Sequence, residues 1–108
     1  MQPYRPSRSP CPVGRASRVI GDRWVLLILR EALLGVDRFD GFAARLDISR
    51  ATLTSRLAWM VDAGVLRREP PDAKYARYLL TDAGRALEPV VSALGAWGDA
   101  WLPRAESA

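Results

Sequence analysis

The spacing of the hydrophobic residues changes at Gly64, and this change limits the folds that the chain can adopt. Before Gly64, apolar residues recur three and four positions apart, which is typical of amphipathic helices. After it, Tyr78 and Leu80 fall on one face of an extended segment and Leu79 on the other, as side chains do along a strand. We therefore expect a mainly α fold with one small β-hairpin (α+β), in which helices precede the hairpin.

Five helices are expected, and several have a residue suited to begin or end them. Asp22, Ser49 and Thr81 can cap helix N-termini, because a short side-chain oxygen accepts a backbone N–H that has no partner within the helix. Gly35 and Gly64 are suited to end helices, since glycine readily adopts the left-handed conformation common there. The expected helices span residues 12–20, 23–34, 39–46, 50–63 and about 81–102.

Length and composition indicate a flexible N-terminal arm at residues 1–10 and one domain at residues 11–108. One cysteine and no histidine exclude an internal disulfide framework, Ser-His catalytic pairs and nearly all ordinary zinc sites. There is no Gly-rich phosphate loop, so we expect neither an enzyme nor a cofactor. The longest apolar stretch is far shorter than the ~20 residues that cross a bilayer, and the N-terminus lacks an apolar leader. A cytoplasmic protein with no membrane partner is therefore predicted.

Basic residues are concentrated in the first part of the chain. Residues 1–80 hold 14 Lys and Arg against 8 Asp and Glu, whereas residues 81–108 hold 2 against 4. This asymmetry fits a surface that faces a polyanion, although an ordinary solvated surface is the simpler interpretation of charge alone.

The strongest local pattern is a pair of short helices separated by a turn at residues 46–49 and followed at once by a basic hairpin. In a winged helix-turn-helix the first of these helices braces the second, which enters the major groove of DNA. If the apolar stripe of the second helix is centred between Leu53 and Leu57, its outer face carries Ala51, Thr52, Ser55 and Trp59, with Arg50, Thr54 and Arg56 beside them. An indole is unusual on a groove-facing helix, so Trp59 is expected to turn toward the hairpin or the first helix.

Ten residues around this pattern are predicted to contact DNA. Each one alone is more simply a helix cap or a solvated side chain, but residues 49–80 hold six basic and three acidic residues, and this clustering favours DNA. Base reading is expected mainly from Arg50, Thr52, Ser55 and Arg56, and phosphate contacts from Ser49 and the hairpin. The predicted DNA-binding residues are Ser49, Arg50, Thr52, Thr54, Ser55, Arg56, Arg67, Arg68, Lys74 and Arg77.

The last expected helix carries more apolar side chains than so small a core can cover. We expect a second copy of the chain to cover them in a homodimer, with Pro89 kinking or splitting the helix. A helix folded back within a monomer is one alternative, and a pocket for an aromatic effector formed by Trp24, Trp97 and Trp101 is another. The predicted dimerisation residues are Leu87, Val91, Leu94, Trp97 and Trp101.

Five motifs in the same order and spacing resemble the HxlR-type regulators, winged-helix proteins related to the MarR group. The motifs are CPV at 11–13, IGDRWVLLILREAL at 20–33, RFDGF at 38–42, ISRATLTSRLAWMVDAGVLRRE at 48–69 and YLLTDAGRAL at 78–87. The sequence departs from the family pattern at Trp59, where a charged residue is usual, and at Leu79, where an arginine is common.

The resemblance implies a homodimer held by the terminal helices, a recognition helix at about 49–63, a wing at about 66–80, and binding to inverted repeats in double-stranded DNA. Carried over by position, Ser49, Arg50, Thr54 and Arg56 match the polar positions of the family's recognition helix. Together with the basic cluster, this predicts a DNA-binding transcription repressor that responds to a small-molecule or redox signal. The alternative is a winged-helix module that binds another protein and no DNA.

Cys11 is a candidate redox sensor. It matches an N-terminal cysteine with which some members of the family sense electrophiles or disulfide stress, by forming a disulfide between subunits. It stands near Arg8 and Arg15 at the expected start of a helix. A small buried thiol that serves packing alone is the simpler alternative.

Overall fold

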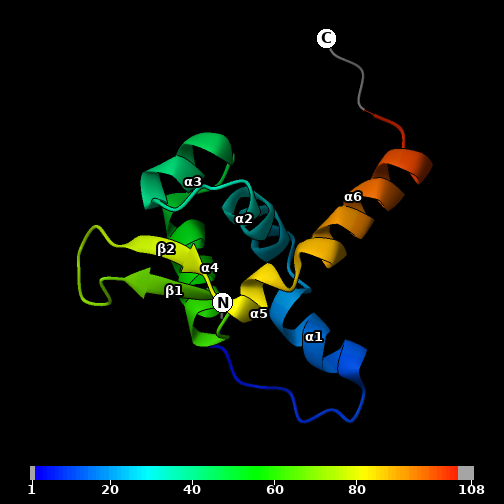
Figure 1. Cartoon of the computed structure of the whole chain (residues 1–108), viewed down its shortest axis with the longest axis horizontal. Helices are drawn as coiled ribbons and strands as arrows, with labels where there is room; N and C mark the ends of the chain where they lie inside the picture. Colours follow the sequence, from blue (N-terminus) through cyan, green and yellow to red (C-terminus); the bar gives the residue numbers. More distant parts are fainter. Residues whose placement is uncertain (1, 105–108) are drawn as a thin grey trace.

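The computed structural model describes residues 2–104, which fold into packed helices with a small antiparallel hairpin at one side (Figure 1). In chain order the elements are α1 (Pro12–Ile20), α2 (Arg23–Leu33), α3 (Phe39–Arg45), α4 (Arg50–Asp62), β1 (Leu66–Glu69), β2 (Arg77–Leu80), α5 (Asp82–Arg85) and α6 (Glu88–Trp101). The expected order of helices and hairpin is confirmed.

Helix α2 lies at the centre of the packing, as its largely apolar sequence predicts. Val25, Ile28 and Leu29 have no exposed surface, and α2 contacts α1, α4, α6 and β2. Leu53 and Leu57 of α4 belong to the same buried cluster. Burial of a side chain of this size contributes about 1.5–3 kcal/mol, so the contact between α2 and α4 firmly sets the position of α4.

The helix ends follow the expected capping residues. Asp22 Oδ1 accepts the N–H groups of the next helix at 2.9 and 3.0 Å, and Thr81 Oγ1 accepts the N–H of Gly84 at 3.1 Å. Gly35 and Gly64 have φ values of +103° and +79°, a conformation that side chains with a Cβ rarely adopt. These residues end α2 and α4, as predicted.

The last predicted helix is divided into α5 and α6. Pro89 stands in the first turn of α6, where the missing N–H leaves no helical hydrogen bond broken. The preceding helix ends at Arg85, so the prediction of a kink or a split is confirmed as a split. In Figure 1, α6 projects away from the other helices, and none of its residues is buried.

The hairpin is the expected wing, but a third segment joins it. Strands β1 and β2 pair from Leu66 opposite Leu80 to Glu69 opposite Arg77. On the other side of β2, the N–H of Tyr78 donates to the carbonyl of Asp37 at 2.7 Å. The segment before α3 therefore anchors the wing against the helix-turn-helix.

Residues 2–10 contain no helix or strand, but they are attached to the helices. The ring of Tyr4 packs edge-on against Trp59 of α4, with 5.0 Å between the ring centroids. The carbonyl of Arg5 accepts a hydrogen bond from Arg18 Nε at 3.1 Å. Among residues 2–104, every helix is too short or too polar to span a bilayer.

Candidate nucleic-acid interface

Helices α3 and α4 form the helix-turn-helix, and the turn between them ends at Ser49. Ser49 Oγ accepts the N–H of Thr52 at 3.1 Å and so caps α4. The buried side of α4 packs on α2 and α3. The exposed residues in the first half of α4 are Arg50, Ala51 and Thr54, followed by Ala58.

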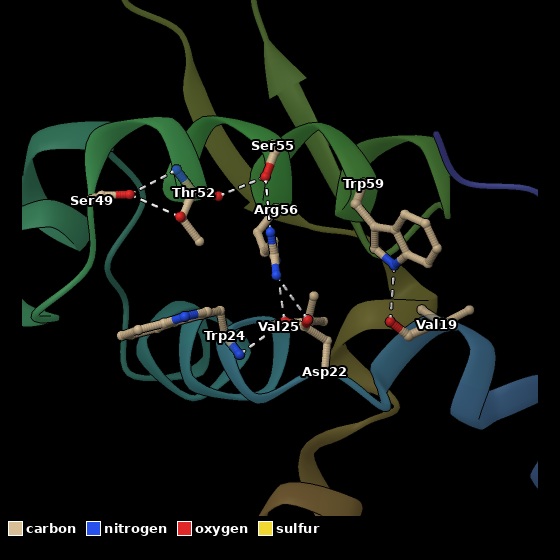
Figure 2. Close-up of polar contacts among 9 residues, drawn as sticks. All are labelled: Val19, Asp22, Trp24, Val25, Ser49, Thr52, Ser55, Arg56 and Trp59. Atoms are coloured by element: carbon tan, nitrogen blue, oxygen red, sulfur yellow. Dashed lines mark hydrogen bonds and ion pairs between the residues drawn. The ribbon is translucent and has the colours of Figure 1, made fainter. Parts of the chain in front are cut away.

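This outward face is rotated relative to the one expected from the sequence. Thr52 and Ser55 are half-buried and Trp59 is only 7% exposed, although all three were expected to face outward on the helical wheel. Helix α1 is the cause, because Trp59 Nε1 donates to the carbonyl of Val19 at 3.0 Å (Figure 2). Trp59 therefore turns away from the groove-facing side, as expected, and it packs against α1. The free side of α4 thereby shifts toward the wing.

Arg56 is held by an acidic residue of its own chain. Its Nη2 lies 3.2 Å from Asp22 Oδ2, and both side chains are about a quarter exposed (Figure 2). Burial alone would raise the pKa of Asp22, but the hydrogen bond and charge of Arg56 and the N–H groups of Val25 and Trp24 outweigh it, so the pKa of Asp22 is lowered. Arg56, predicted to read bases, therefore reaches DNA only if it leaves Asp22.

Three wing arginines are also engaged within the chain. Arg77 donates twice to Asp37 Oδ2, at 2.9 and 2.7 Å. Arg67 lies 2.8 Å from Glu69 on the same strand. Arg68 donates to the carbonyl of Ala73 at 2.7 Å and packs over the ring of Tyr78. These contacts shape the wing, and most of them lie at exposed positions where solvent and salt compete with them.

A hollow of about 750 Å³ opens between the start of α3, the first turns of α4 and the tip of the wing. Three cations face one acid there, because Arg38, Arg50 and Lys74 share the wall with Asp40. The hollow is lined by Arg38, Phe39, Asp40, Arg50, Thr54, Lys74, Tyr75, Ala76 and Tyr78. The arrangement brings together Arg50, Thr54 and Lys74, which the sequence predicted separately as DNA-binding residues.

Of the three cations in this wall, Arg38 is the one that was not among the predicted DNA-binding residues. Its Nη1 donates to the carbonyl of Tyr75 in the wing loop at 3.1 Å, and its backbone pairs with that of Arg77. Arg38 precedes α3 and carries no periodic signal of its own. Only the folding of the wing back onto this segment brings Arg38 into the interface.

The remaining predicted site residues lie outside this hollow. Cys11 is exposed and caps α1, with its Sγ accepting the N–H of Gly14 at 3.4 Å. On α6, Leu94, Trp97 and Trp101 are 49%, 57% and 73% exposed. The other two predicted dimerisation residues, Leu87 and Val91, pack against the core of their own chain. Within the described residues, no group of His, Cys, Asp and Glu is placed to hold a metal ion.

The braced helix α4, its capped N-terminus and the adjoining wing define a winged helix-turn-helix. A family model described as HxlR-like helix-turn-helix matches residues 19–106 of the chain. An uncharacterized HTH-type transcriptional regulator of Mycobacterium tuberculosis is 49% identical over 96 residues, which cover 87% of this chain and 61% of that protein.

Two solved structures are also similar. PA1607, described as a candidate transcription factor, matches with a TM-score of 0.84 and 36% identity, over 94% of this chain and 72% of that one. The redox regulator HypR in its reduced form matches with a TM-score of 0.74 and 31% identity, over 83% of this chain and 92% of that one.

The chain belongs to the HxlR-like helix-turn-helix family, which confirms the resemblance seen in its motifs. Its relatives are transcription regulators and not enzymes, in agreement with the expectation from the sequence. The chain spans about 61% of the length of the mycobacterial relative.

Proposed function

We propose that the chain is a cytoplasmic, sequence-specific regulator of transcription that binds double-stranded DNA as a homodimer and acts as a repressor. The observation that carries this proposal is the hollow between α4 and the wing, where cations from three separate segments surround the exposed first turns of a capped helix. The major groove admits a helix of this kind, and phosphates on either side of the groove attract the cations.

The exposure of each cation indicates how readily it can contact DNA. Lys74 and Arg50 are exposed, and the contact between Arg50 and Asp40 spans 3.7 Å with side chains 73% and 86% exposed. Exposed pairs typically contribute about 0–1 kcal/mol, so a phosphate or a guanine edge can replace Asp40 at little cost. We propose that Arg50 and Thr54 read bases, while Ser49, Lys74 and Arg38 hold phosphates.

The remaining predicted contacts require larger adjustments. Thr52 and Ser55 are half-buried, and Arg56 must leave Asp22 before it can reach a base. Arg67 and Arg68 already have partners within the wing, and Arg77 pairs with Asp37 in the segment before α3. We assign all six a secondary part in the proposed interface: Thr52, Ser55, Arg56, Arg67, Arg68 and Arg77.

The homodimer is proposed to form through α6. Apolar residues line a hollow of about 520 Å³ along this helix, and they are Pro89, Val90, Ala93, Leu94 and Trp97. A helix that exposes two tryptophans and a leucine is best covered by the same surface of a second copy. Two α4 helices about 34 Å apart would then reach successive major grooves of an inverted repeat.

The proposed signal is an oxidant or electrophile acting at Cys11, for which two observations speak. Cys11 is exposed, and the similar protein HypR is described as a redox regulator. The alternative aromatic effector has less support, because the hollow beside Trp97 is lined only by α6 residues and does not include Trp24. Diamide treatment tests the proposal, since a disulfide-linked dimer and altered DNA binding are expected in the wild type and absent in Cys11→Ser.

Selection of genomic fragments on the purified protein, followed by reading their common motif, tests the proposed function. A motif with two-fold symmetry is expected, with binding that weakens steeply as salt rises. A motif without symmetry would contradict the dimer. Binding that is absent or insensitive to salt would contradict the DNA interface and favour the winged-helix module that binds a protein.

A further inference from the structure

The N-terminal arm and α1 together carry four arginines and no acidic residue. Within residues 1–21 the basic residues are Arg5, Arg8, Arg15 and Arg18, and the first acid in the chain is Asp22. Asp22 already pairs with Arg56. Among residues 2–104, none of the four arginines forms an ion pair, whereas Arg50, Arg56, Arg67 and Arg77 each do.

The fold gathers these four arginines into one surface, which we name the arm–α1 strip. Arg15 Nη1 donates to the carbonyl of Ser9 at 2.8 Å, and Arg18 Nε donates to the carbonyl of Arg5 at 3.1 Å. These two hydrogen bonds lay the arm along α1 and bracket Arg8 between them. All four arginine side chains are exposed.

The strip adjoins α4, the helix proposed to enter the major groove. Arg18 lies over the ring of Trp59 at 5.6 Å, and the ring of Tyr4 meets the same indole edge-on. Figure 1 shows the arm passing the C-terminal end of α4 on its way to α1. The hollow beside the wing includes Arg50 and Thr54 at the other end of α4. Cationic surfaces therefore border both ends of this helix.

We propose that the arm–α1 strip binds the phosphate backbone of duplex DNA and extends the interface beyond α4 and the wing. Four neighbouring cations without a counter-charge repel one another, and a polyanion relieves that repulsion. Guanidinium groups match phosphate oxygens in geometry, and continuity with α4 selects DNA over other polyanions. The cost of ordering the arm is reduced by its prolines and by the packing of Tyr4 on Trp59. This inference rests on the proposed function.

The salt dependence of duplex binding tests the strip. Fluorescence anisotropy of a labelled duplex of random sequence measures the backbone contacts without requiring the operator. The variant Arg5→Gln/Arg8→Gln removes two cations whose side chains have no hydrogen-bond partner within residues 2–104. The matched control Arg85→Gln/Arg104→Gln removes the same charge from α5 and from the segment after α6.

Each phosphate contact contributes about 0.9 to the slope of log binding constant against log salt. The arm variant should therefore lower the steepness of this slope by nearly two for each subunit, or nearly four for the homodimer. The control should keep the wild-type slope, and both variants should keep the wild-type melting temperature. An unchanged slope in the arm variant, or an equal loss in the control, would overturn the proposal. Weakened self-association with an unchanged slope would instead assign the strip to the subunit interface and also overturn it.

The strip and the proposed function fail in different ways. If the wild-type protein shows no salt-dependent binding to any duplex, the proposed function fails. If the wild type binds and Lys74→Gln lowers the slope while Arg5→Gln/Arg8→Gln does not, only the strip fails.

Discussion

Two ion pairs beside the helix-turn-helix differ in their surroundings. Glu31 of α2 is 2% exposed and pairs with Arg45 of α3, with Arg30 at 3.4 Å on its other oxygen. Arg50 and Asp40 lie 3.7 Å apart, and both side chains are largely exposed. Arg45 is itself 55% exposed, so the enclosed member of the first pair is its carboxylate, and we call this pair enclosed in that sense. The enclosed pair joins two helices of the fold, whereas the exposed pair can exchange Asp40 for a phosphate. The burial of the carboxylate partner, and not the number of ion pairs, therefore indicates which arginines are held by the fold and which are available to DNA.

The largest effect is expected from opening the enclosed pair. Arg45→Met leaves the buried Glu31 with only Arg30. Because Arg45 is itself 55% exposed and Arg30 remains, the free energy of unfolding should fall by about 2 kcal/mol, less than for a fully buried pair. Urea denaturation followed by circular dichroism measures this loss. In the double variant Glu31→Leu/Arg45→Met, which leaves no buried charge unpaired, much of the stability should return. If Arg45→Met barely changed the free energy of unfolding, burial of Glu31 would not make its ion pair stronger than the exposed pair of Arg50 and Asp40.

Acid should weaken the fold through the same enclosed groups. Burial alone would raise the pKa of Glu31, but the hydrogen bond and charge of Arg45, followed by those of Arg30, outweigh it and lower the pKa. The pKa of Asp22 is lowered as well. A carboxyl whose pKa is lowered on folding stabilises the protein above its unfolded pKa, and this stability is lost as the pH falls through the folded pKa.

The melting temperature should therefore decline progressively below a pH of about 4, where carboxyl groups of the unfolded chain bind protons. Glu31→Gln should show a shallower decline than the wild type, because one of the two responsible groups is missing. A wild-type melting temperature that is constant down to a pH of about 3 would contradict this expectation.

Asp22 tests the intermediate case, since it and Arg56 are about a quarter exposed. Asp22→Asn keeps an oxygen that can cap α2 but removes the charge that holds Arg56, so a loss of about 1 kcal/mol is expected. If the released Arg56 reaches DNA, the salt slope of duplex binding should become steeper by about 0.9 for each subunit of the homodimer. Asp40→Asn is the matched control, because it releases Arg50 with almost no loss of stability. An unchanged slope in Asp22→Asn would exclude Arg56 from the interface.

Much of the fold followed from the sequence, because caps and apolar spacing act locally. Asp22, Ser49 and Thr81 cap their helices as predicted. The outward face of α4 was predicted less well, because its orientation depends on α1 covering Trp59, a contact between residues 40 positions apart. Arg38 was missed for the same reason, since its place in the hollow depends on the wing.

The partners of the cations were not predictable from the sequence either. Clustering of basic residues indicated a DNA-binding surface, but the pairing of Arg56 with Asp22 and of Arg77 with Asp37 depends on helices and strands that are distant in the chain. The charge pattern of the sequence thus indicated where the interface lies, but not which of its arginines are free to contact DNA. Their availability depends on how exposed the ion pair of each arginine is.

The smallest effect is expected at Glu69, which pairs with Arg67 at 2.8 Å on the outer surface of the wing. Both side chains are about half exposed, so solvent already screens their attraction, and holding two long side chains in one geometry offsets much of what remains. Glu69→Gln should therefore change the free energy of unfolding by less than about 0.5 kcal/mol, measured by urea denaturation beside Arg45→Met. The short distance in this pair makes the test informative, because distance alone would rank it above the contact between Arg50 and Asp40. A loss comparable to that of Arg45→Met would show that geometry outweighs enclosure, and Arg67 would then be bound too firmly to serve a phosphate.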